Sequence, residues 1–271
     1  MRINHNLMAM NTHRQLGINT TSGSKAMEKL SSGLRINRAA DDAAGLSISE
    51  KMRGQIRGLT QAARNTQDGI SFIQTAEGAL NEVSAMLVRM KELAVQKANG
   101  TLSEQDGNNI EEELKQLAEE IINISKGSEF NGKNLFTTID IVTSDDQNSK
   151  FTIGNEIKPE DFGFITATEE DDSTTYSVNM ENMTTEKIED AIDTVNTARA
   201  KLGAQQNRLE HIYNNINTTT ENLQAAEARI RDTDMAQEMM EFTKNNILQQ
   251  AAQAMLAQAN QVPQGVLQLL R

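Results

Sequence analysis

Two long stretches with the same heptad spacing limit what this chain can fold into. Steps of alternately four and three residues from Met52 to Ala94 meet an apolar side chain at nine of thirteen positions. The same steps from Ile188 to Ile230 also meet nine of thirteen. Apolar residues at this period line one side of a helix that packs against other helices. The pattern predicts a mainly α fold in which two long, antiparallel, coiled-coil-like helices pack with a third helix over residues 103–126.

The boundaries of these helices can also be predicted. Residues 30–49 (LSSGLRINRAADDAAGLSIS) are typical of a linker followed by a helix start. Asp41 or Asp42 can cap a helix that opens at about Ala43. No further ligands follow at the spacing of a calcium loop, so the two aspartates do not predict a metal site. Ser103 is the expected N-cap of the third helix and Gly127 its expected C′ residue.

The segment over residues 1–36 gives a weaker helical signal. Ile3, Leu7 and Met10 have helical spacing, but Gly17 and Gly23 interrupt it together with the Thr and Ser residues at 20–24. A helix with this little local support is expected to order only against a partner.

The middle of the chain differs from both ends. Five of the seven Phe residues fall between 130 and 164, where FNGKNLF and KFTIGNEI predict short strands, turns and small β-hairpins. Acidic residues crowd residues 140–190 with few Lys or Arg. This segment is therefore expected to be exposed and solvated.

The C-terminal stretch carries no charged residue between Asn245 and Leu270. Its heptad stripe consists of Leu248, Ala252, Met255, Ala259, Val262, Val266 and Leu269. Seven glutamines and Pro263 exclude a membrane span. An exposed helix of a monomer normally carries charge on its outer face. The stretch therefore predicts a helix that other protein molecules cover, which is the environment of an assembly.

Composition excludes several classes of function. The net charge of −12 leaves no positive patch for nucleic acid, and the absence of Cys removes disulfides and thiolate chemistry. His5, His13 and His211 are far apart and have no HExxH or triad-like neighbours. We expect neither an enzyme nor a bound cofactor or metal. The N-terminus lacks the apolar region of a cleavable signal, and no apolar run spans a membrane.

Six motifs give the chain a specific resemblance to a known family. They lie at both ends of the chain: MRINHNLMAMNTHRQLG at 1–17, the linker at 30–49, QDGISFIQTAEGALNEVSAMLVRMKELAVQ at 67–96, FNGKNL at 130–135, LGAQQNRL at 202–209 and NQVPQGVLQLLR at 260–271. On these residues the chain resembles bacterial flagellin. No shared motif matches residues 137–183, where that family varies.

The resemblance implies a division of labour along the chain. Residues 1–42 and 236–271 would form paired helices that line the core of a tubular filament and become ordered on assembly. Residues 43–136 and 184–235 would form the helical shell around it. Residues 137–183 would be a short variable segment that faces outward. The expected self-assembly residues are Ile3 and Leu7 with members of the C-terminal stripe, namely Leu248, Met255, Val262, Val266 and Leu269.

The resemblance also implies partners. The chain would be exported unfolded by the flagellar type III apparatus and would form a helical homopolymer outside the cell for motility. An export chaperone would cover the C-terminal helix, and filament cap and hook-junction proteins would contact the filament. In the family, the helix segment matching residues 89–96 contributes with an acidic residue to recognition by the host Toll-like receptor for flagellin. Here that implies Arg89, Leu93 and Glu113.

Inter-subunit packing is the other role expected of these residues. Leu93 lies with Ala76, Val83 and Met90 on a second apolar stripe of the first long helix. A second stripe widens the apolar face, so this helix touches more than one neighbour. We expect Met90 and Leu93 to pack against neighbouring subunits.

Two other functions fit parts of the sequence. A hook–filament junction protein shares a signature like residues 30–49, but the ending NQVPQGVLQLLR favours the filament subunit. A cytoplasmic coiled-coil scaffold would carry charged e and g positions to the end of the chain, which the charge-free stretch contradicts.

Overall fold

The computed structural model describes the backbone of residues 6–99, 103–170, 173–179 and 183–269. It describes their side chains except at 167–170, 173–175 and 262–269. The chain divides into two compact units. We call residues 1–54 with 222–271 the terminal unit, and residues 55–221 the body. The long helices α2 (Ala43–Lys97) and α4 (Thr185–Arg231) contribute residues to both.

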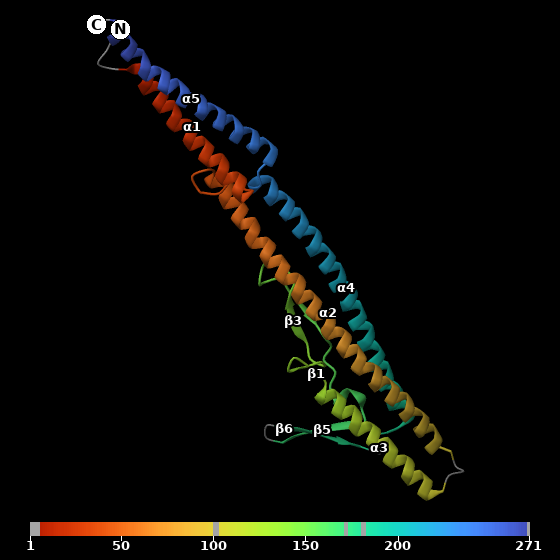
Figure 1. The fold of residues 1–271 in the computed structure, drawn as a ribbon. Coiled ribbons are helices and arrows are strands. Elements are labelled where there is room, and N and C mark those ends of the chain that lie inside the picture. The colour runs from red at the N-terminus through yellow and green to blue at the C-terminus, as the bar shows by residue number, and fades with distance from the viewer. Residues whose placement is uncertain (1–5, 100–102, 171–172, 180–182, 270–271) are drawn as a thin grey trace. The chain divides into compact units, whose positions relative to one another are not determined.

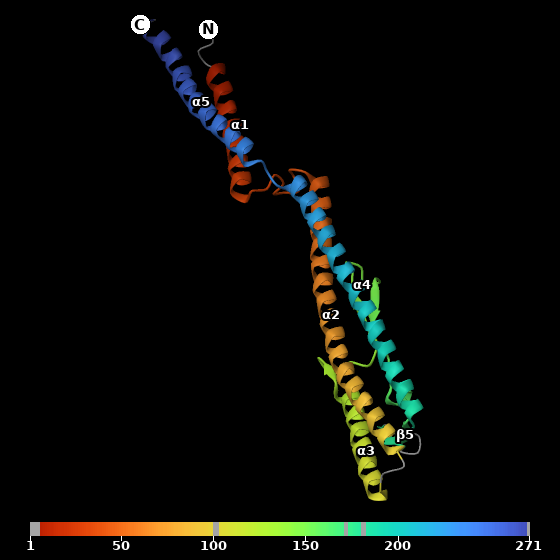
Figure 2. The ribbon, with the colours of Figure 1, turned by 90° about the vertical axis from the view of Figure 1, so that its right-hand side faces the viewer.

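The terminal unit is built on two helices, α1 (Leu7–Ser32) and α5 (Met235–Leu269), which lie side by side (Figures 1 and 2). Their polar contacts run in opposite directions along the two sequences. Asn6 Nδ2 donates to the Ala259 carbonyl at 2.7 Å, Gln249 Nε2 donates to Thr20 Oγ1 at 2.9 Å, and Lys29 Nζ lies 3.6 Å from a Glu238 carboxylate oxygen. The two helices are therefore an antiparallel pair in one register.

Helix α1 continues through the glycines and hydroxyl residues that were expected to interrupt it. Thr20 and Thr21 donate their hydroxyl hydrogens to the carbonyls of Leu16 and Gly17, at 2.8 and 2.9 Å, so these polar groups are satisfied within the helix. Helix α5 passes close to Gly23, where a Cβ would lie 3.8 Å from Asn245 Cβ, an ordinary contact distance. Helix α1 thus packs against α5 of the same chain.

The start of α2 confirms the capping prediction and separates the two aspartates. Asp42 Oδ1 accepts a hydrogen bond from the Gly45 amide at 2.9 Å, as an N-cap side chain does. Asp41 faces the preceding loop, where it accepts from the Asn37 and Arg38 amides. The helix itself runs to Lys97.

Three helices of the body confirm the heptad prediction. Helices α2 and α4 run antiparallel, with Gln67 Nε2 donating to Tyr213 OH at 3.0 Å and Lys91 Nζ 2.8 Å from Glu189 (Figure 1). The third helix, α3 (Glu104–Gly127), begins at a capping box formed by Ser103. Its end differs from the prediction, because Gly127 is still helical and Ser128 is the C-cap.

A single apolar cluster joins these helices and the middle of the chain. Its buried members from α2 are Phe72, Ile73, Ala76, Leu80, Val83, Leu87, Met90, Leu93 and Ala94. Those from α3 are Ile110, Leu114, Ala118, Ile121 and Ile122, and those from α4 are Ile188, Ala191, Val195, Ala198, Leu202 and Leu209. The body thus has a core of its own within one chain.

The motif FNGKNL forms a tight hairpin. Strands β1 (Glu129–Phe130) and β2 (Lys133–Asn134) are antiparallel, and Asn131 and Gly132 connect them with φ of 51° and 73°. Asn-Gly is the favoured pair for a two-residue turn with both φ values positive. Phe130 meets Phe72 of α2 edge to face, with ring centroids 6.0 Å apart.

Two more antiparallel strand pairs complete the described part of the middle: β3 (Ile139–Val142) with β4 (Lys150–Ile153), and β5 (Ile165–Glu170) with β6 (Ser173–Val178). A short 3-10 helix, η1 (Pro159–Phe162), lies between them. The expectation that residues 140–190 are simply exposed is wrong. The buried side chains of this segment that join the body core before α4 begins are Ile141, Ile153, Ile157, Phe162, Phe164 and Ile165. The acidic residues alternate with these apolar ones, so the charges can face water while the aromatic rings pack inward.

Candidate assembly surface

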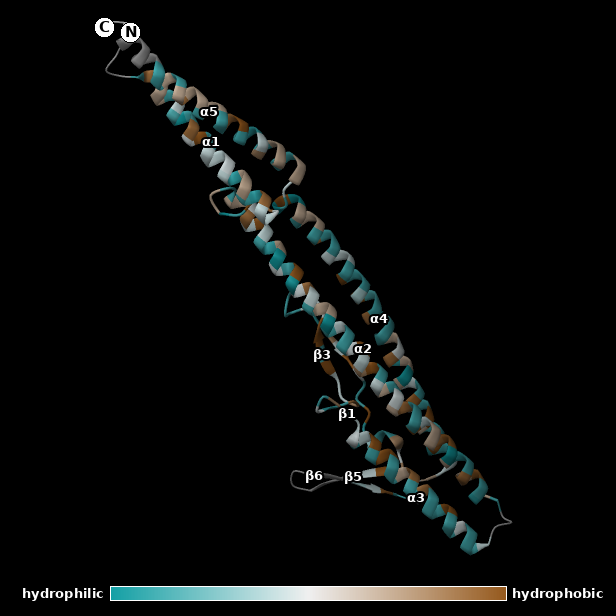
Figure 3. Cartoon of the chain, in the orientation of Figure 1, coloured by the Kyte–Doolittle hydropathy of each residue, from teal (hydrophilic) through white to brown (hydrophobic). Residues whose placement is uncertain are grey.

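Exposed apolar side chains gather on the terminal unit. Among the described residues, fourteen large hydrophobic side chains are exposed, and twelve of them belong to this unit. They are Leu7, Met8, Met10, Ile18, Met27, Ile48, Met235, Met239, Met240, Ile247, Leu248 and Met255. Figure 3 shows hydrophobic residues recurring along α1 and α5. Apolar surface on this scale marks an interaction site.

The contact between α1 and α5 fully buries only small apolar residues, where the side chains are described. The buried apolar residues of the two helices, where their side chains are described, are Ala26, Ala252 and Ala259. Small residues let two backbones come close without using large side chains. The larger residues project elsewhere: Leu7 and Ile18, for example, are three turns apart and so share a face of α1.

Three of the seven predicted self-assembly residues can be placed with their side chains. Leu7 is 60% exposed, Leu248 40% and Met255 53%. Val262, Val266 and Leu269 continue helix α5, but their side chains lie outside the described residues, and Ile3 lies outside the described backbone as well.

Other residues of this surface were missed by the sequence interpretation. Met235, Met239 and Met240 lie at the start of α5, where neighbouring acidic residues such as Glu238 obscure the apolar stripe. The four-residue spacing of Met235 and Met239 was the available signal.

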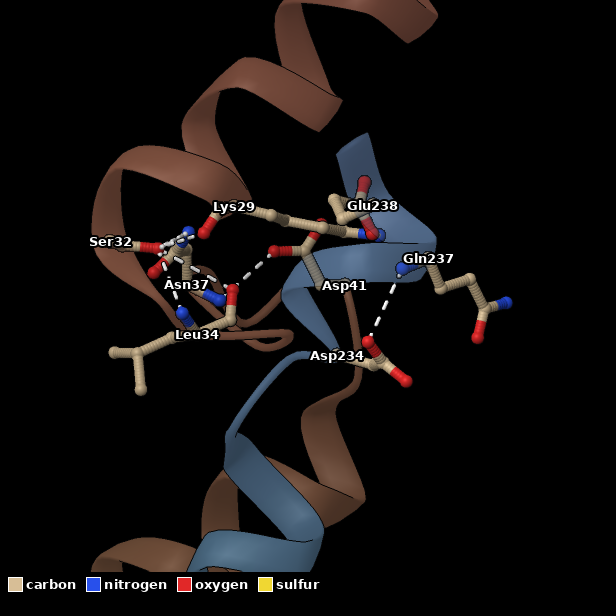
Figure 4. A network of polar contacts seen from close by, with 8 residues as sticks. All are labelled: Lys29, Ser32, Leu34, Asn37, Asp41, Asp234, Gln237 and Glu238. Atoms are coloured by element: carbon tan, nitrogen blue, oxygen red, sulfur yellow. Dashed lines mark hydrogen bonds and ion pairs between the residues drawn. The ribbon is translucent and has the colours of Figure 1, made fainter. Parts of the chain in front are cut away.

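A polar network closes the connection between α1 and α2 (Figure 4). Gly33 ends α1 in the left-handed conformation, with φ of 71°, and its amide donates to the Lys29 carbonyl at 2.8 Å. Ser32 Oγ accepts from Asn37 Nδ2 at 2.7 Å, which ties the helix end to the loop. Hydrogen bonds from backbone N–H groups, the Arg38 amide first, lower the pKa of Asp41.

The second connection, from α4 to α5, is bonded to the first. Gly33 accepts from the Thr233 amide at 3.1 Å, and the Arg35 amide donates to the Arg231 carbonyl at 2.7 Å. Asp234 begins α5 by accepting from the amides of Ala236 and Gln237 (Figure 4). Backbone hydrogen bonds therefore link the connection between α1 and α2 to the connection between α4 and α5.

One ion pair reinforces these connections. Arg231 Nη1 lies 2.7 Å from Glu50 Oε1, and the Arg231 side chain is 13% exposed. The hydrogen bond from Arg231 is the main cause that lowers the pKa of Glu50. Charge on Glu50 thus supports the end of α4.

The three residues expected to meet an innate receptor lie on the body, and their exposure differs. Arg89 is exposed and donates to Glu113 of α3 through Nη2 at 3.0 Å and Nε at 3.2 Å, which raises the pKa of Arg89. Leu93 is 2% exposed and, like Met90, belongs to the body core. The expectation that Met90 and Leu93 pack against neighbouring subunits is therefore wrong for the folded body, because its own helices α3 and α4 share the same apolar cluster.

The described residues contain no metal-ligand cluster and no membrane-spanning helix. No three of their His, Asp or Glu side chains gather so that they could hold a metal ion. None of the helices, as far as they are described, is long and apolar enough to cross a bilayer.

Comparison with known proteins assigns both ends of the chain. Residues 3–140 match the model of the bacterial flagellin N-terminal helical region, and residues 185–270 match that of the C-terminal helical region. Flagellin of Halalkalibacterium halodurans is 57% identical over 274 residues, and flagellin of Bacillus subtilis is 52% identical over 304. The flagellar filament 33 kDa core protein of Treponema phagedenis is 47% identical over 291 residues. Each alignment covers 100% of both chains.

Proposed function

This chain belongs to the bacterial flagellin family and is a structural subunit of the flagellar filament, and we propose that α1 and α5 present the surface through which its copies assemble. The observation that carries the proposal is the concentration of exposed apolar residues on the terminal unit, where twelve of the fourteen described examples lie. A second copy of the chain supplies the apolar surface that would remove these side chains from water.

The division of labour implied by the family is part of the proposal. Residues 1–42 and 236–271 would line the filament core, 43–136 and 184–235 would form the shell, and 137–183 would face outward. The fully buried apolar residues of α1 and α5, where their side chains are described, are all alanines, which supports the idea that the terminal segments gain order on assembly. Trypsin digestion before and after polymerisation tests it, and termini equally resistant in both states would refute it.

A single charge on α5 tests the assembly surface. Met255→Asp places a carboxylate where we expect another copy, and a buried unpaired charge is strongly unfavourable. The variant should keep native helicity by circular dichroism because Met255 is 53% exposed in the single chain. It should lose the polymer that the native chain forms on seeds, measured by sedimentation.

The matched control is Gln147→Asp, which adds the same charge at an exposed position of the body, within the segment expected to face outward. It should sediment as polymer like the native chain. If Met255→Asp polymerises as well as Gln147→Asp, α5 is not the assembly surface.

Export and localisation follow from the same proposal. The chain would leave the cell unfolded through the type III apparatus and act extracellularly, with an export chaperone on α5 until release. Cap and hook-junction proteins would contact the assembled ends. The charge-free sequence from Asn245 to Leu270 supports a chaperone, since it exposes apolar groups before assembly. A pull-down in which the chaperone retains a chain lacking residues 245–271 would argue against this contact.

Recognition by the host receptor would use the exposed ion pair of Arg89 and Glu113, and their contacts with other subunits would use the same groups. Leu93 would contribute indirectly, because its buried side chain packs in the body core and so fixes the position of α2. Receptor activation in reporter cells that is unchanged by Arg89→Ala would remove Arg89 from this role.

A further inference from the structure

Methionine is divided unequally between the parts of this molecule. Every described methionine of α1 and α5 is exposed, and these seven are Met8, Met10, Met27, Met235, Met239, Met240 and Met255, with exposed fractions from 48% to 68%. The other described methionines are half-buried or buried, and these are Met52, Met86, Met90 and Met183. The terminal helices therefore present thioethers to solvent, and the rest of the described chain shields them.

The composition makes these thioethers the principal target of an oxidant. The full sequence contains 13 Met but no Cys and no Trp. Methionine is thus the only source of sulfur in the chain. A mild peroxide that would attack cysteine first in most proteins has only methionine to attack here.

The chemistry has a direct consequence for an apolar surface. A lone pair of the methionine sulfur attacks one oxygen of hydrogen peroxide, and the O–O bond breaks. The transferred oxygen, now bound to sulfur, gives up its proton to the departing hydroxide. The products are a sulfoxide and water. Sulfur is oxidised by two electrons and the peroxide is reduced by two. The product is polar, so a side chain that favoured burial in a neighbour now resists it.

We propose that the exposed methionines of α1 and α5 are an oxidation site that controls assembly, in which hydrogen peroxide converts the free chain to a sulfoxide form that does not join the filament. The inference rests on the proposed function, because it requires that these helices be covered by other copies. Once covered, the same thioethers are out of reach of peroxide, so the filament resists oxidation that disables its free subunit. Reduction of the sulfoxides restores the assembling form.

The proposal is tested on the full-length native chain, as monomer and as seeded polymer, treated with hydrogen peroxide. Peptide mass spectrometry should find sulfoxide at the seven terminal methionines of the monomer before it appears at Met90, and little at these seven in the polymer. Treated monomer should lose its sedimenting polymer while keeping its helicity. Methionine sulfoxide reductases A and B should restore assembly. Normal assembly of fully oxidised monomer, or equal oxidation of the seven in monomer and polymer, overturns the proposal.

A pair of variants separates these methionines from the rest. Leucine at all seven positions keeps the apolar character without the thioether, so that chain should assemble even after peroxide. Leucine at Met52, Met86 and Met183 is the matched control and should leave the native sensitivity. If the seven-leucine chain does not assemble even without peroxide, the test is the peroxide-treated native chain after incubation with the reductases. Recovery of its assembly supports the proposal, and no recovery overturns it.

Failure of this inference can be told from failure of the proposed function. Untreated Met255→Asp reports on the assembly surface alone. If that variant polymerises, the proposed surface is wrong whatever peroxide does. If it fails to polymerise while oxidised native chain succeeds, the surface stands and the oxidation site is wrong.

Discussion

The terminal unit and the body are both made of helices with apolar stripes, yet they bury different kinds of side chain. In the terminal unit the described buried apolar residues are Ala26, Ile36, Ala252 and Ala259. The body buries rings and long aliphatic chains, with Phe72, Phe164, Leu87 and Met90 among its largest fully buried residues, and leaves only Val88 and Val95 as large exposed hydrophobics among those described.

The difference shows how one sequence supports both folding and assembly. Apolar burial stabilises by about 25 cal/mol per Å² removed from water. An alanine side chain offers little such area, so the fully buried apolar residues of α1 and α5 contribute less to folding than the rings and long aliphatic chains of the body core, and large side chains of these helices stay exposed in the single chain. The body needs no partner for its core. Substitutions in the two units should therefore fail in different assays.

The largest effect should come from a charge in the body core. Leu93→Asp buries an unpaired carboxylate among α2, α3 and α4, at a cost of several kcal/mol, comparable with the stability of a whole domain. Circular dichroism should show the body unfolded or its melting temperature greatly lowered. This contrasts with Met255→Asp, which should spare the fold and abolish the polymer.

Val95→Asp is the matched control, because Val95 lies two residues along the same helix and is 56% exposed. Its unfolding free energy should stay within about 0.5 kcal/mol of native, as for most surface substitutions. A native-like melting curve for Leu93→Asp would contradict the burial that separates the two units.

Leu93 also illustrates what the sequence could and could not predict. Its place on a second apolar stripe correctly indicated that α2 touches more than one neighbour. The stripe does not say whether that neighbour belongs to the same chain. In the structure the neighbours are α3 and α4 of the same chain, whose apolar residues belong to the same cluster as Leu93. Periodicity defines a face of a helix, and only tertiary contacts define its partner.

Local chemistry was a better guide than composition. The Asn131-Gly132 turn and the Ser103 capping box were predictable because they depend on a few neighbouring residues. The acidic composition of residues 140–190 led to the wrong prediction that this segment is simply exposed. Its apolar residues, such as Ile153 and Phe164, are buried in the body core. On α1, glycine suggested an interruption because its low helix propensity was considered without α5, whose packing outweighs it.

A smaller effect should come from the strand end that α4 holds in the body. Gln205 accepts from the Gly154 amide at 3.1 Å and donates to the Gly154 carbonyl at 3.2 Å. Gly154 has φ of +95°, and a Cβ there would clash with the Thr137 carbonyl oxygen. Gly154→Ala should therefore cost roughly 3 kcal/mol of body stability through strain and displaced backbone, measured by denaturant unfolding.

Gly132→Ala provides the comparison for that variant. Gly132 also has positive φ, +73°, but nothing lies within 4 Å of its Cβ position. Only the conformational cost remains, about 1 kcal/mol. Equal losses in the two variants would show that crowding at Thr137 has no role, and the body would be more tolerant there than its burial implies.

The smallest effect should be a pH dependence in the connections of the terminal unit, which depend on exposed charge where the body depends on apolar burial. The pKa of Glu50 lies below its ordinary value of 4.5, chiefly because of Arg231. A carboxylate with a lowered pKa contributes stability that is complete above the ordinary value and is lost as the pH falls through the lowered one. Glu50 is about half exposed, so solvent screens the pair and the contribution is small.

Acid below pH 4.5 should reduce the hydrogen-exchange protection of the Arg35 amide, which donates to the Arg231 carbonyl. The protection of amides at the body core should change less over the same range. Glu50→Gln keeps the shape of the side chain without its charge, so its Arg35 protection should already be reduced at pH 7 and respond less to acid. If acid reduced protection at Arg35 equally in the native chain and in Glu50→Gln, the ion pair would have no part in holding the two connections together.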